Sequence, residues 1–276
     1  MSAARSVLPN ERPAKNAPLE ATQPKIRLRG LAKSFGDKVV LDGVDLDVLP
    51  GTSMVVIGGS GSGKSVLLKC ILGLLEPDAG TIEIDGHDLL AMSRPERTAV
   101  HRRIGMLFQN GALFDSLPVW ENVTFGLLAQ NRLSRRAAPA AAAEFLAEVG
   151  LAASVGELSP AELSGGMQKR VALARAIAAR PDIMFFDEPT TGLDPIMGAV
   201  IDGLIVDCVR RLGSTAIAIT HDMASARRIG DAAAMIHRGR IIWSGPASQL
   251  MDSGNPEVDQ FTHGRREGPI QMELRR

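Results

Sequence analysis

The sequence predicts an α/β protein with a mainly parallel core sheet, an antiparallel β subdomain and a helical subdomain. Short apolar runs such as SMVVI and IMFF are typical of strands that are buried on both faces. Helical stretches alternate with these runs, which indicates parallel strands covered by helices. Near the start, IRLRG and VVLDGVDLDVL alternate apolar with polar residues, as strands with one exposed face do.

Composition narrows the class of protein. The 276 residues include 31 basic and 31 acidic side chains, and 45% are hydrophobic, so the chain can bury a sizeable core. No apolar run approaches the roughly 20 residues of a membrane helix, so we expect any membrane association to be peripheral. A net charge of zero provides no long-range field, and we expect no nucleic-acid partner. The two cysteines, Cys70 and Cys208, are too few for a zinc site, which favours a reducing cytosol.

The first half of the chain supplies most of the β-type signal. Residues 1–25 mix Pro, Ala and charges without periodicity, and we expect a disordered leader. The main domain is expected at 26–245, beginning with the two alternating strands and the buried strand SMVVIG. A Gly-rich loop follows, and then an amphipathic helix in KSVLLKCILGLL, a turn over Pro77 to Gly80 and a strand in TIEIDG.

The second half begins with helices and returns to strands. A helical subdomain is expected at about 112–180, with a polar break at Asn131 to Arg136. Apolar strands follow in IMFFD, STAIAIT, AAAMIH and RIIWSG. Residues 246–276 are expected to form a C-terminal helix and an extended tail, whose end GRREGPIQMELRR is too polar to form a core.

The Gly-rich loop fits the phosphate-binding pattern GxxxxGK[ST]. Glycines let backbone N–H groups curl around phosphate oxygens, while Lys64 can reach terminal phosphates and the Ser65 hydroxyl suits Mg²⁺. The plain alternative is a flexible turn, but the position between a buried strand and a helix favours phosphate. The predicted nucleotide-binding residues here are Gly58, Gly59, Ser60, Gly61, Ser62, Gly63, Lys64, Ser65 and Val66.

Two acids follow the buried run IMFF. Asp187 would emerge at the carboxyl edge of the sheet, where such folds bind ligands, and Glu188 comes next. Asp187 can hold Mg²⁺, and Glu188 can polarise the water that attacks the γ-phosphate. Further upstream, Ser164, Gly165 and Gly166 begin a strongly helical segment, so they form either a second anion site or a plain helix cap.

Together these motifs resemble the ATP-binding subunits of ABC transporters over nearly all of Ile26 to Gly245. The resemblance implies an ABC-ATPase fold of the P-loop NTPase class, with ATP and Mg²⁺ as cofactors. LSGGM resembles the signature motif, which in that family contacts ATP held by a second subunit, so the active form would be a dimer. The remaining matches are Gln109 as the glutamine that contacts the metal, Asp194 in the D-loop, His221 as the switch histidine and Phe35 as the adenine-stacking aromatic, for which core packing is the alternative.

A narrower resemblance is to the Mla-type phospholipid transport ATPases, carried by QNGALFDSLPVWENVTFGL, EPTTGLDPIM and VDQFTHGRREGPI. It implies a peripheral subunit on the cytoplasmic face of the inner membrane that helps to move phospholipids between the inner and outer membranes. The implied partners are a membrane permease, a second copy of the chain, a small accessory protein and a lipid-binding subunit.

Other functions stay open at this point. The chain could serve another ABC transporter with a different small substrate, or act as an ABC-type ATPase in DNA repair or translation. The second class normally brings tandem cassettes, a coiled-coil arm or a basic face, and the sequence shows none of them. A P-loop kinase would leave LSGGM and His221 without a role.

Two segments have alternative interpretations. Gly111 to Val123 is rich in apolar residues, and these either line a groove for a permease helix or pack inside the helical subdomain. The tail from Gly264 to Arg276 either becomes ordered on a partner or is a solvated end.

Overall fold

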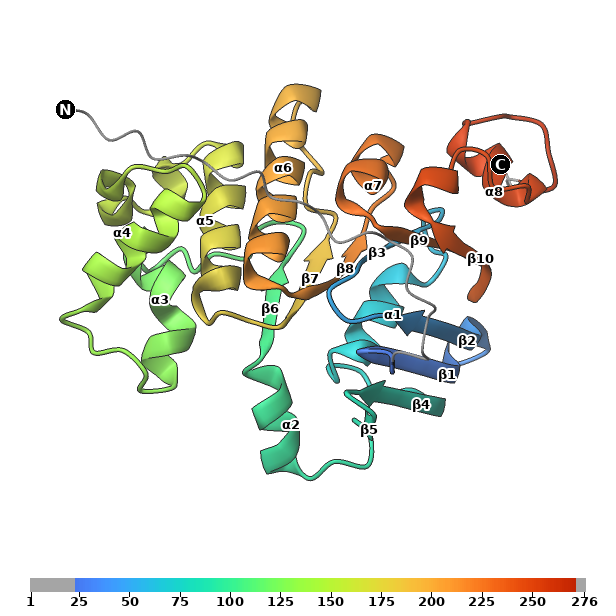
Figure 1. The fold of residues 1–276 in the computed structure, drawn as a ribbon, viewed down its shortest axis with the longest axis horizontal. Helices are drawn as coiled ribbons and strands as arrows, with labels where there is room; N and C mark the ends of the chain where they lie inside the picture. Colours follow the sequence, from blue (N-terminus) through green and yellow to red (C-terminus); the bar gives the residue numbers. More distant parts are fainter. Residues whose placement is uncertain (1–22, 272–276) are drawn as a thin grey trace, which may run out of the picture.

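The computed structural model describes residues 23–271, which form two sheets and the helices around them (Figure 1). The core sheet has the order β10-β9-β3-β8-β7-β6 and is parallel except for the edge strand β10. Its strands are β3 (Ser53–Ile57), β6 (Ile104–Leu107), β7 (Ile183–Asp187), β8 (Thr215–Ile219), β9 (Ala232–His237) and β10 (Arg240–Pro246).

The second sheet is antiparallel and has the order β2-β1-β4-β5. Its strands are β1 (Ile26–Phe35), β2 (Lys38–Val48), β4 (Ala79–Ile84) and β5 (His87–Asp88). β1, β2 and β4 are the alternating segments that the sequence pattern predicts, whereas the two-residue strand β5 is not predicted, and β1 and β2 bury only part of their residues. The predicted division into parallel and antiparallel sheets is therefore confirmed.

Eight α-helices lie among the described residues, and Figure 1 shows α3, α4 and α5 grouped at one end of the molecule. They are α1 (Lys64–Ile71), α2 (Arg94–His101), α3 (Val119–Ala129), α4 (Ala138–Glu148), α5 (Gly165–Ala178), α6 (Pro195–Leu212), α7 (Met223–Ile229) and α8 (Pro256–Thr262). The polar break at Asn131 to Arg136 separates α3 from α4, as predicted. No helix of residues 23–271 is long and apolar enough to cross a membrane.

The core sheet has a different hydrophobic cluster on each face, because successive strand residues point to opposite sides. On β7, Met184 and Phe186 pack toward α3–α7, whereas Ile183 and Phe185 pack toward α1 and the antiparallel sheet. All four side chains are fully buried. A wholly apolar strand is therefore required here, which explains the uninterrupted run IMFF.

Three local expectations differ from the structure. The expected turn over Pro77 to Gly80 lies earlier, at 72–75, because Ala79 and Gly80 already belong to β4 and Ala79 pairs with Ala32. The ordered domain also begins before Ile26, since the Lys25 ammonium forms ion pairs with Asp85 (2.8 Å) and Asp182 (2.7 Å). The rest of the expected leader, residues 1–22, lies outside the described residues.

The third difference concerns the tail. The Gln260 amide in α8 accepts a hydrogen bond from the Ile270 N–H (2.7 Å) and donates one to the Ile270 carbonyl (3.0 Å). The Ile270 side chain packs against the helical-side hydrophobic cluster. The segment up to residue 271 is therefore held against its own domain by one amide side chain, a contact that composition does not reveal. The end of the tail, 272–276, lies outside the described residues.

Candidate active site

The phosphate loop joins β3 to α1 and depends on two glycines at close contacts. Gly58 has φ +157°, and a Cβ added there would lie 2.3 Å from the Ile236 carbonyl oxygen. Gly63 has φ +109°, and its Cβ would lie 2.8 Å from the Val40 carbonyl oxygen. Larger residues would force the loop away from β9 and β2. The loop can therefore curl tightly at the start of α1, where free N–H groups and the helix dipole favour an anion.

The Lys64 side chain lies inside this loop. Its ammonium donates hydrogen bonds to the carbonyl oxygens of Gly58 (2.7 Å) and Gly59 (2.9 Å). Burial lowers the pKa of Lys64, while the carboxylates of Glu188 and Asp187 raise it in part. Ser62 Oγ is buried beside it and has no hydrogen-bond partner among the described residues. A buried cation and an unpaired hydroxyl within a ring of amides fit a phosphate chain.

A hollow of about 410 Å³ opens beside the loop. Phe35 stands at its edge with 51% of its surface exposed, so the core-packing alternative for this residue is wrong. The Lys33 ammonium lies 5.7 Å from the centre of the Phe35 ring. An exposed aromatic face next to a phosphate loop suits a purine base, and stacking stays a prediction. The hollow is lined by Phe35, Lys38, Val40, Gly61, Gly63, Lys64, Ser65 and Val66.

At the carboxyl end of β7, Glu188 and His221 meet. The His221 Nδ1 atom lies 2.6 Å from Glu188 Oε2, and the Thr191 hydroxyl donates to the same oxygen at 2.9 Å. Glu188 has a left-handed backbone with φ +49°, which is unfavourable for a residue with a side chain. Strain of this kind clusters at functional positions, and here the strained residue carries the carboxylate that meets His221.

Asp187 is the last residue of β7, and nearby cations only partly offset the cost of its negative charge. Burial and the neighbouring Glu188 raise its pKa, and the cations Lys64, Lys69 and Lys169 lower it in part. The described residues contain no group of three or more His, Cys, Asp or Glu that could hold a metal unaided. One carboxylate with hydroxyl and amide oxygens, as Ser65 and Gln109 supply, instead suits Mg²⁺ that is shared with phosphates. The donor set therefore fits the predicted metal.

Sequence analysis missed Lys169 on α5. This lysine is only 6% exposed, and its ammonium contacts the main-chain oxygen of Gln109. Burial lowers its pKa, while Asp187 and Glu188 raise it in part. Helical periodicity could have identified this residue. Lys169 lies four residues before the buried Leu173 and therefore on the same, buried face of α5.

The signature residues lie elsewhere in the same chain. Ser164 caps α5, with its hydroxyl accepting from the Met167 N–H at 3.4 Å. A Cβ on Gly166 would lie 3.0 Å from Met197 Sδ, so LSGGM packs against the start of α6. Asp194 caps that helix through hydrogen bonds from Ile196 and Met197 N–H, both 3.0 Å, which gives it a structural role. The residues Ser164, Gly165 and Gly166 do not line the Phe35 hollow of their own chain.

The apolar segment Gly111 to Val123 divides between the two interpretations. Val119 and Val123 are buried in the core, and Trp120 packs against it. Phe114 is 42% exposed, and its ring lies 4.6 Å from that of the equally exposed Phe125. Among the large hydrophobic residues of this segment, Phe114 is the exposed one, and Phe125 on α3 extends its exposed surface.

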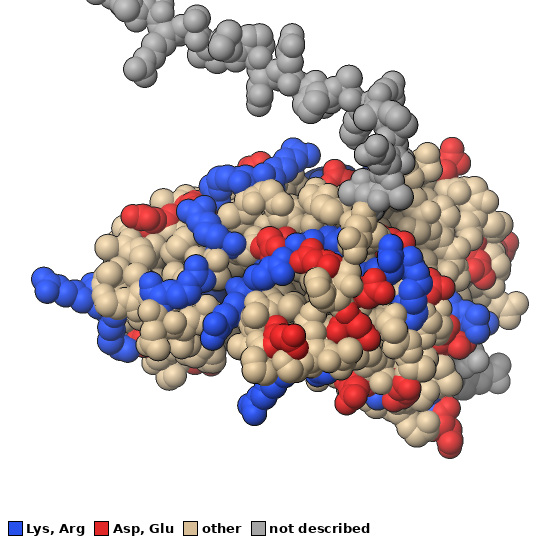
Figure 2. Space-filling view, turned by 60° about the horizontal axis from the view of Figure 1, so that its bottom comes forward, with Lys and Arg blue, Asp and Glu red and all other residues tan. Residues whose placement is uncertain are grey.

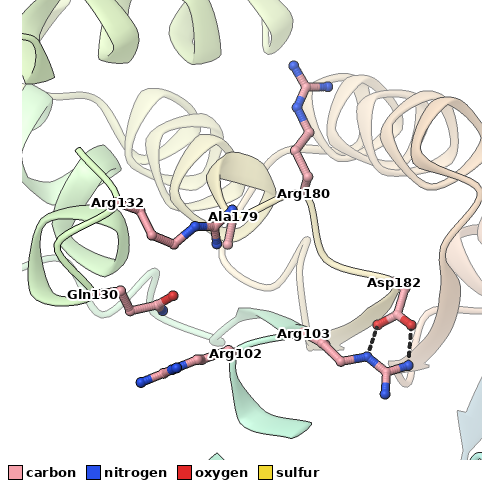
Figure 3. A pocket seen from close by; sticks show the side chains of 7 residues that line it. All are labelled: Arg102, Arg103, Gln130, Arg132, Ala179, Arg180 and Asp182. Atoms are coloured by element: carbon pink, nitrogen blue, oxygen red, sulfur yellow. Dashed lines mark hydrogen bonds and ion pairs between the residues drawn. The ribbon is translucent and has the colours of Figure 1, made fainter. Parts of the chain in front are cut away.

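The amino end of β7 is built differently (Figure 3). The Arg103 guanidinium pairs with Asp182, and it also lies 2.6 Å from Asp85. Hydrogen bonds from Arg103 and Lys25 outweigh burial and hold the pKa of Asp182 below its usual range. A hollow here, also of about 410 Å³, is lined by Arg102, Arg103, Gln130, Arg132, Ala179, Arg180 and Asp182.

Comparison with known proteins identifies the family. Residues 41–191 match the family model described as ABC transporter. The chain is 40% identical over 247 residues to the probable ribonucleotide transport ATP-binding protein mkl of Mycobacterium leprae, covering 90% of this chain and 71% of that protein. It is also 40% identical over 247 residues to the intermembrane phospholipid transport system ATP-binding protein MlaF of Haemophilus influenzae, covering 90% of this chain and 93% of MlaF.

A solved structure supports the same conclusion. The dimer of the ATP-binding cassette MJ0796 bound to ADP and Pi is 31% identical, with a TM-score of 0.73, over 80% of this chain and 98% of that chain. The predicted ABC-ATPase fold is confirmed. The chain therefore belongs to the ABC transporter family, as an ATP-binding subunit that hydrolyses ATP.

Proposed function

We propose that this chain is the ATPase subunit of a transporter that moves phospholipids between the inner and outer membranes. The observation that carries the proposal is the 40% identity to MlaF, because it extends over 93% of that protein. The protein would act as a dimer on the cytoplasmic face of the inner membrane, with a membrane permease, a lipid-binding subunit and a small accessory protein as partners.

Nucleotide binding follows from the contacts around the phosphate loop. In the bound state the Lys64 ammonium exchanges the carbonyl oxygens of Gly58 and Gly59 for phosphate oxygens, so a buried cation gains an anionic partner. Phe35 stacks on the base at the open end of the hollow. Ser65, Gln109 and Asp187 would hold Mg²⁺, which would supply positive charge against the phosphates.

Hydrolysis depends on the Glu188–His221 contact. Glu188 is held in position through its Oε2 atom, which accepts a hydrogen bond from the Thr191 hydroxyl and lies 2.6 Å from His221 Nδ1. Its second oxygen can accept a proton from the attacking water, which makes that water a better nucleophile. His221 keeps the carboxylate in position through Nδ1 and, when both ring nitrogens are protonated, can donate to the γ-phosphate through Nε2.

The dimer completes the site. Ser164, Gly165 and Gly166 begin α5, away from the hollow of their own chain, so they would contact the nucleotide that a second copy holds. The exposed Phe114–Phe125 pair would receive a short helix of the permease. Opening and closing of the dimer would thereby reach the membrane partner.

A second candidate substrate comes from mkl, whose name assigns it to ribonucleotide transport. Reconstitution of the co-purified permease complex into vesicles separates the two candidates. Our proposal predicts ATP-dependent transfer of a labelled phospholipid and no uptake of labelled ribonucleotide. The reverse result would contradict the phospholipid assignment and leave the ATPase assignment intact.

A further inference from the structure

A buried carboxylate links two helices behind the catalytic residues. Asp202 on α6 is fully buried, although aspartate is seldom buried without partners. Ser225 Oγ donates to its two oxygens at 2.9 and 2.8 Å, and the Arg228 guanidinium donates to it at 2.9 Å. Both partners lie on α7, so this carboxylate fixes α7 against α6.

The same serine reaches a third segment. Ser225 Oγ lies 3.2 Å from Thr190 Oγ1, within hydrogen-bond distance, and Thr190 is two residues beyond Glu188. Ser225 is itself fully buried. A continuous path of hydrogen bonds therefore runs from the carboxylate of Asp202 through Ser225 to the loop that contains Glu188.

These contacts lie between the two catalytic loops. Glu188 and Thr190 belong to the loop after β7, whereas His221 belongs to the loop after β8 that leads into α7. Asp222 joins His221 to α7 by capping that helix, with its carboxylate accepting from the Ala224 N–H at 2.8 Å. A shift of α7 relative to the β7 loop would thus lengthen the 2.6 Å contact between His221 and Glu188.

We infer that Asp202 and Ser225 are positioning residues for ATP hydrolysis, which hold the His221 loop against the Glu188 loop through Thr190. Neither residue touches nucleotide, and they act only through the geometry of the catalytic pair. The inference rests on the proposed roles of Glu188 and His221, and the experiment is chosen so that failure of each can be told apart.

The test measures kcat and KM for ATP in the purified full-length chain. Ser225→Ala is expected to lower kcat by about three- to tenfold, the worth of about one hydrogen bond, with KM for ATP unchanged. In a His221→Ala background, followed by single-turnover assays, Ser225→Ala should cause no further loss, because residues that act through one another are not additive. An equal loss in both backgrounds would overturn the inference.

Matched variants separate positioning from stability. Ser214 is also a fully buried serine, and its hydroxyl donates to the Pro181 carbonyl at 2.6 Å, at the opposite end of the sheet. Ser214→Ala should reduce thermal stability by a similar amount and leave kcat unchanged. Should Ser225→Ala not fold, Thr190→Val tests the same link and should lower kcat, whereas Thr190→Ser should retain it. Wild-type kcat in Thr190→Val would overturn the inference; wild-type kcat in His221→Ala would instead refute the role of the catalytic pair.

Discussion

The two ends of β7 each bear an aspartate, but their surroundings are opposite. Asp182, just before the strand, pairs with Lys25 and Arg103, and these hydrogen bonds hold its pKa below the usual range despite burial. Asp187 is the last residue of the strand. Its burial and the nearby negative charge of Glu188 raise its pKa. At the amino end, basic side chains of the chain itself neutralise the Asp182 carboxylate. At the carboxyl end, the Asp187 carboxylate is only partly neutralised and can accept a bound cation.

The surface at the amino end of the sheet carries charges of both signs. Figure 2 looks toward the amino end of the core strands, and there Lys and Arg predominate on the left and Asp and Glu on the right, with both signs meeting between them. No continuous basic band crosses this face. The charges at this end include the ion pairs of Arg103 with Asp85 and Asp182, which tie distant parts of the chain together.

The largest expected effect comes from Glu188→Gln. The amide keeps the size of the side chain but removes the group that accepts a proton, so kcat for ATP should fall roughly a hundred- to ten-thousandfold. ATP affinity, measured by a fluorescent analogue, should be retained. A wild-type rate of phosphate release would show that Glu188 is not the base.

Lys64→Ala should act on binding instead. Removing a buried ammonium that faces the phosphates is expected to weaken ATP affinity about ten- to a hundredfold, as measured by calorimetry. Lys33→Ala removes the cation beside Phe35 without touching the phosphate loop and is the matched control. Equal affinity losses in both variants would mean that general positive charge, not the loop, binds the nucleotide.

Smaller, opposite effects on stability are expected at the two ends of β7. Without nucleotide and Mg²⁺, Asp187→Asn should raise the free energy of unfolding by about 1 kcal/mol, because it removes a poorly neutralised charge, as stabilising active-site substitutions do. Asp182→Asn should lower it by no more than about 1 kcal/mol, since half-exposed ion pairs are screened by water. Chemical denaturation of both variants measures the difference, and the same sign in both would contradict the comparison.

The smallest effect is the pH dependence of that difference. The folded-state pKa of Asp182 is lowered, so its stabilisation is present above the ordinary carboxyl pKa of about 3.9 and is lost as pH falls through the lowered value. The folded-state pKa of Asp187 is raised, so its cost is absent below about 3.9 and grows as pH rises through the raised value. Denaturation between about pH 2 and 7 should therefore show Asp187→Asn converging on the wild type near the ordinary carboxyl pKa and Asp182→Asn converging only at lower pH.

Local patterns predicted the phosphate loop, the acids after β7 and nearly every strand, because each depends on neighbours in sequence. The wholly apolar IMFF run favoured a strand with two buried faces, and the glycines between a buried strand and a helix favoured a phosphate loop over a flexible turn. Contacts between residues far apart in the sequence could not be predicted from local patterns. Asp202 and Ser225, Lys169 and Gln109, and Gln260 and Ile270 meet only after folding, and each member alone resembles an ordinary surface residue.

The left-handed backbone of Glu188 also bears on how this ATPase fails in a cell. Glycine would relieve a strain of about 1 kcal/mol at φ +49°, so a Glu188→Gly subunit would be at least as well folded as the active one. Such a subunit would escape the proteases that remove misfolded chains and, in the proposed transporter, would still compete for the permease. An allele that encodes Glu188→Gly is therefore expected to be dominant, because the inactive subunit would inactivate mixed assemblies. An allele with a destabilising core substitution would be recessive.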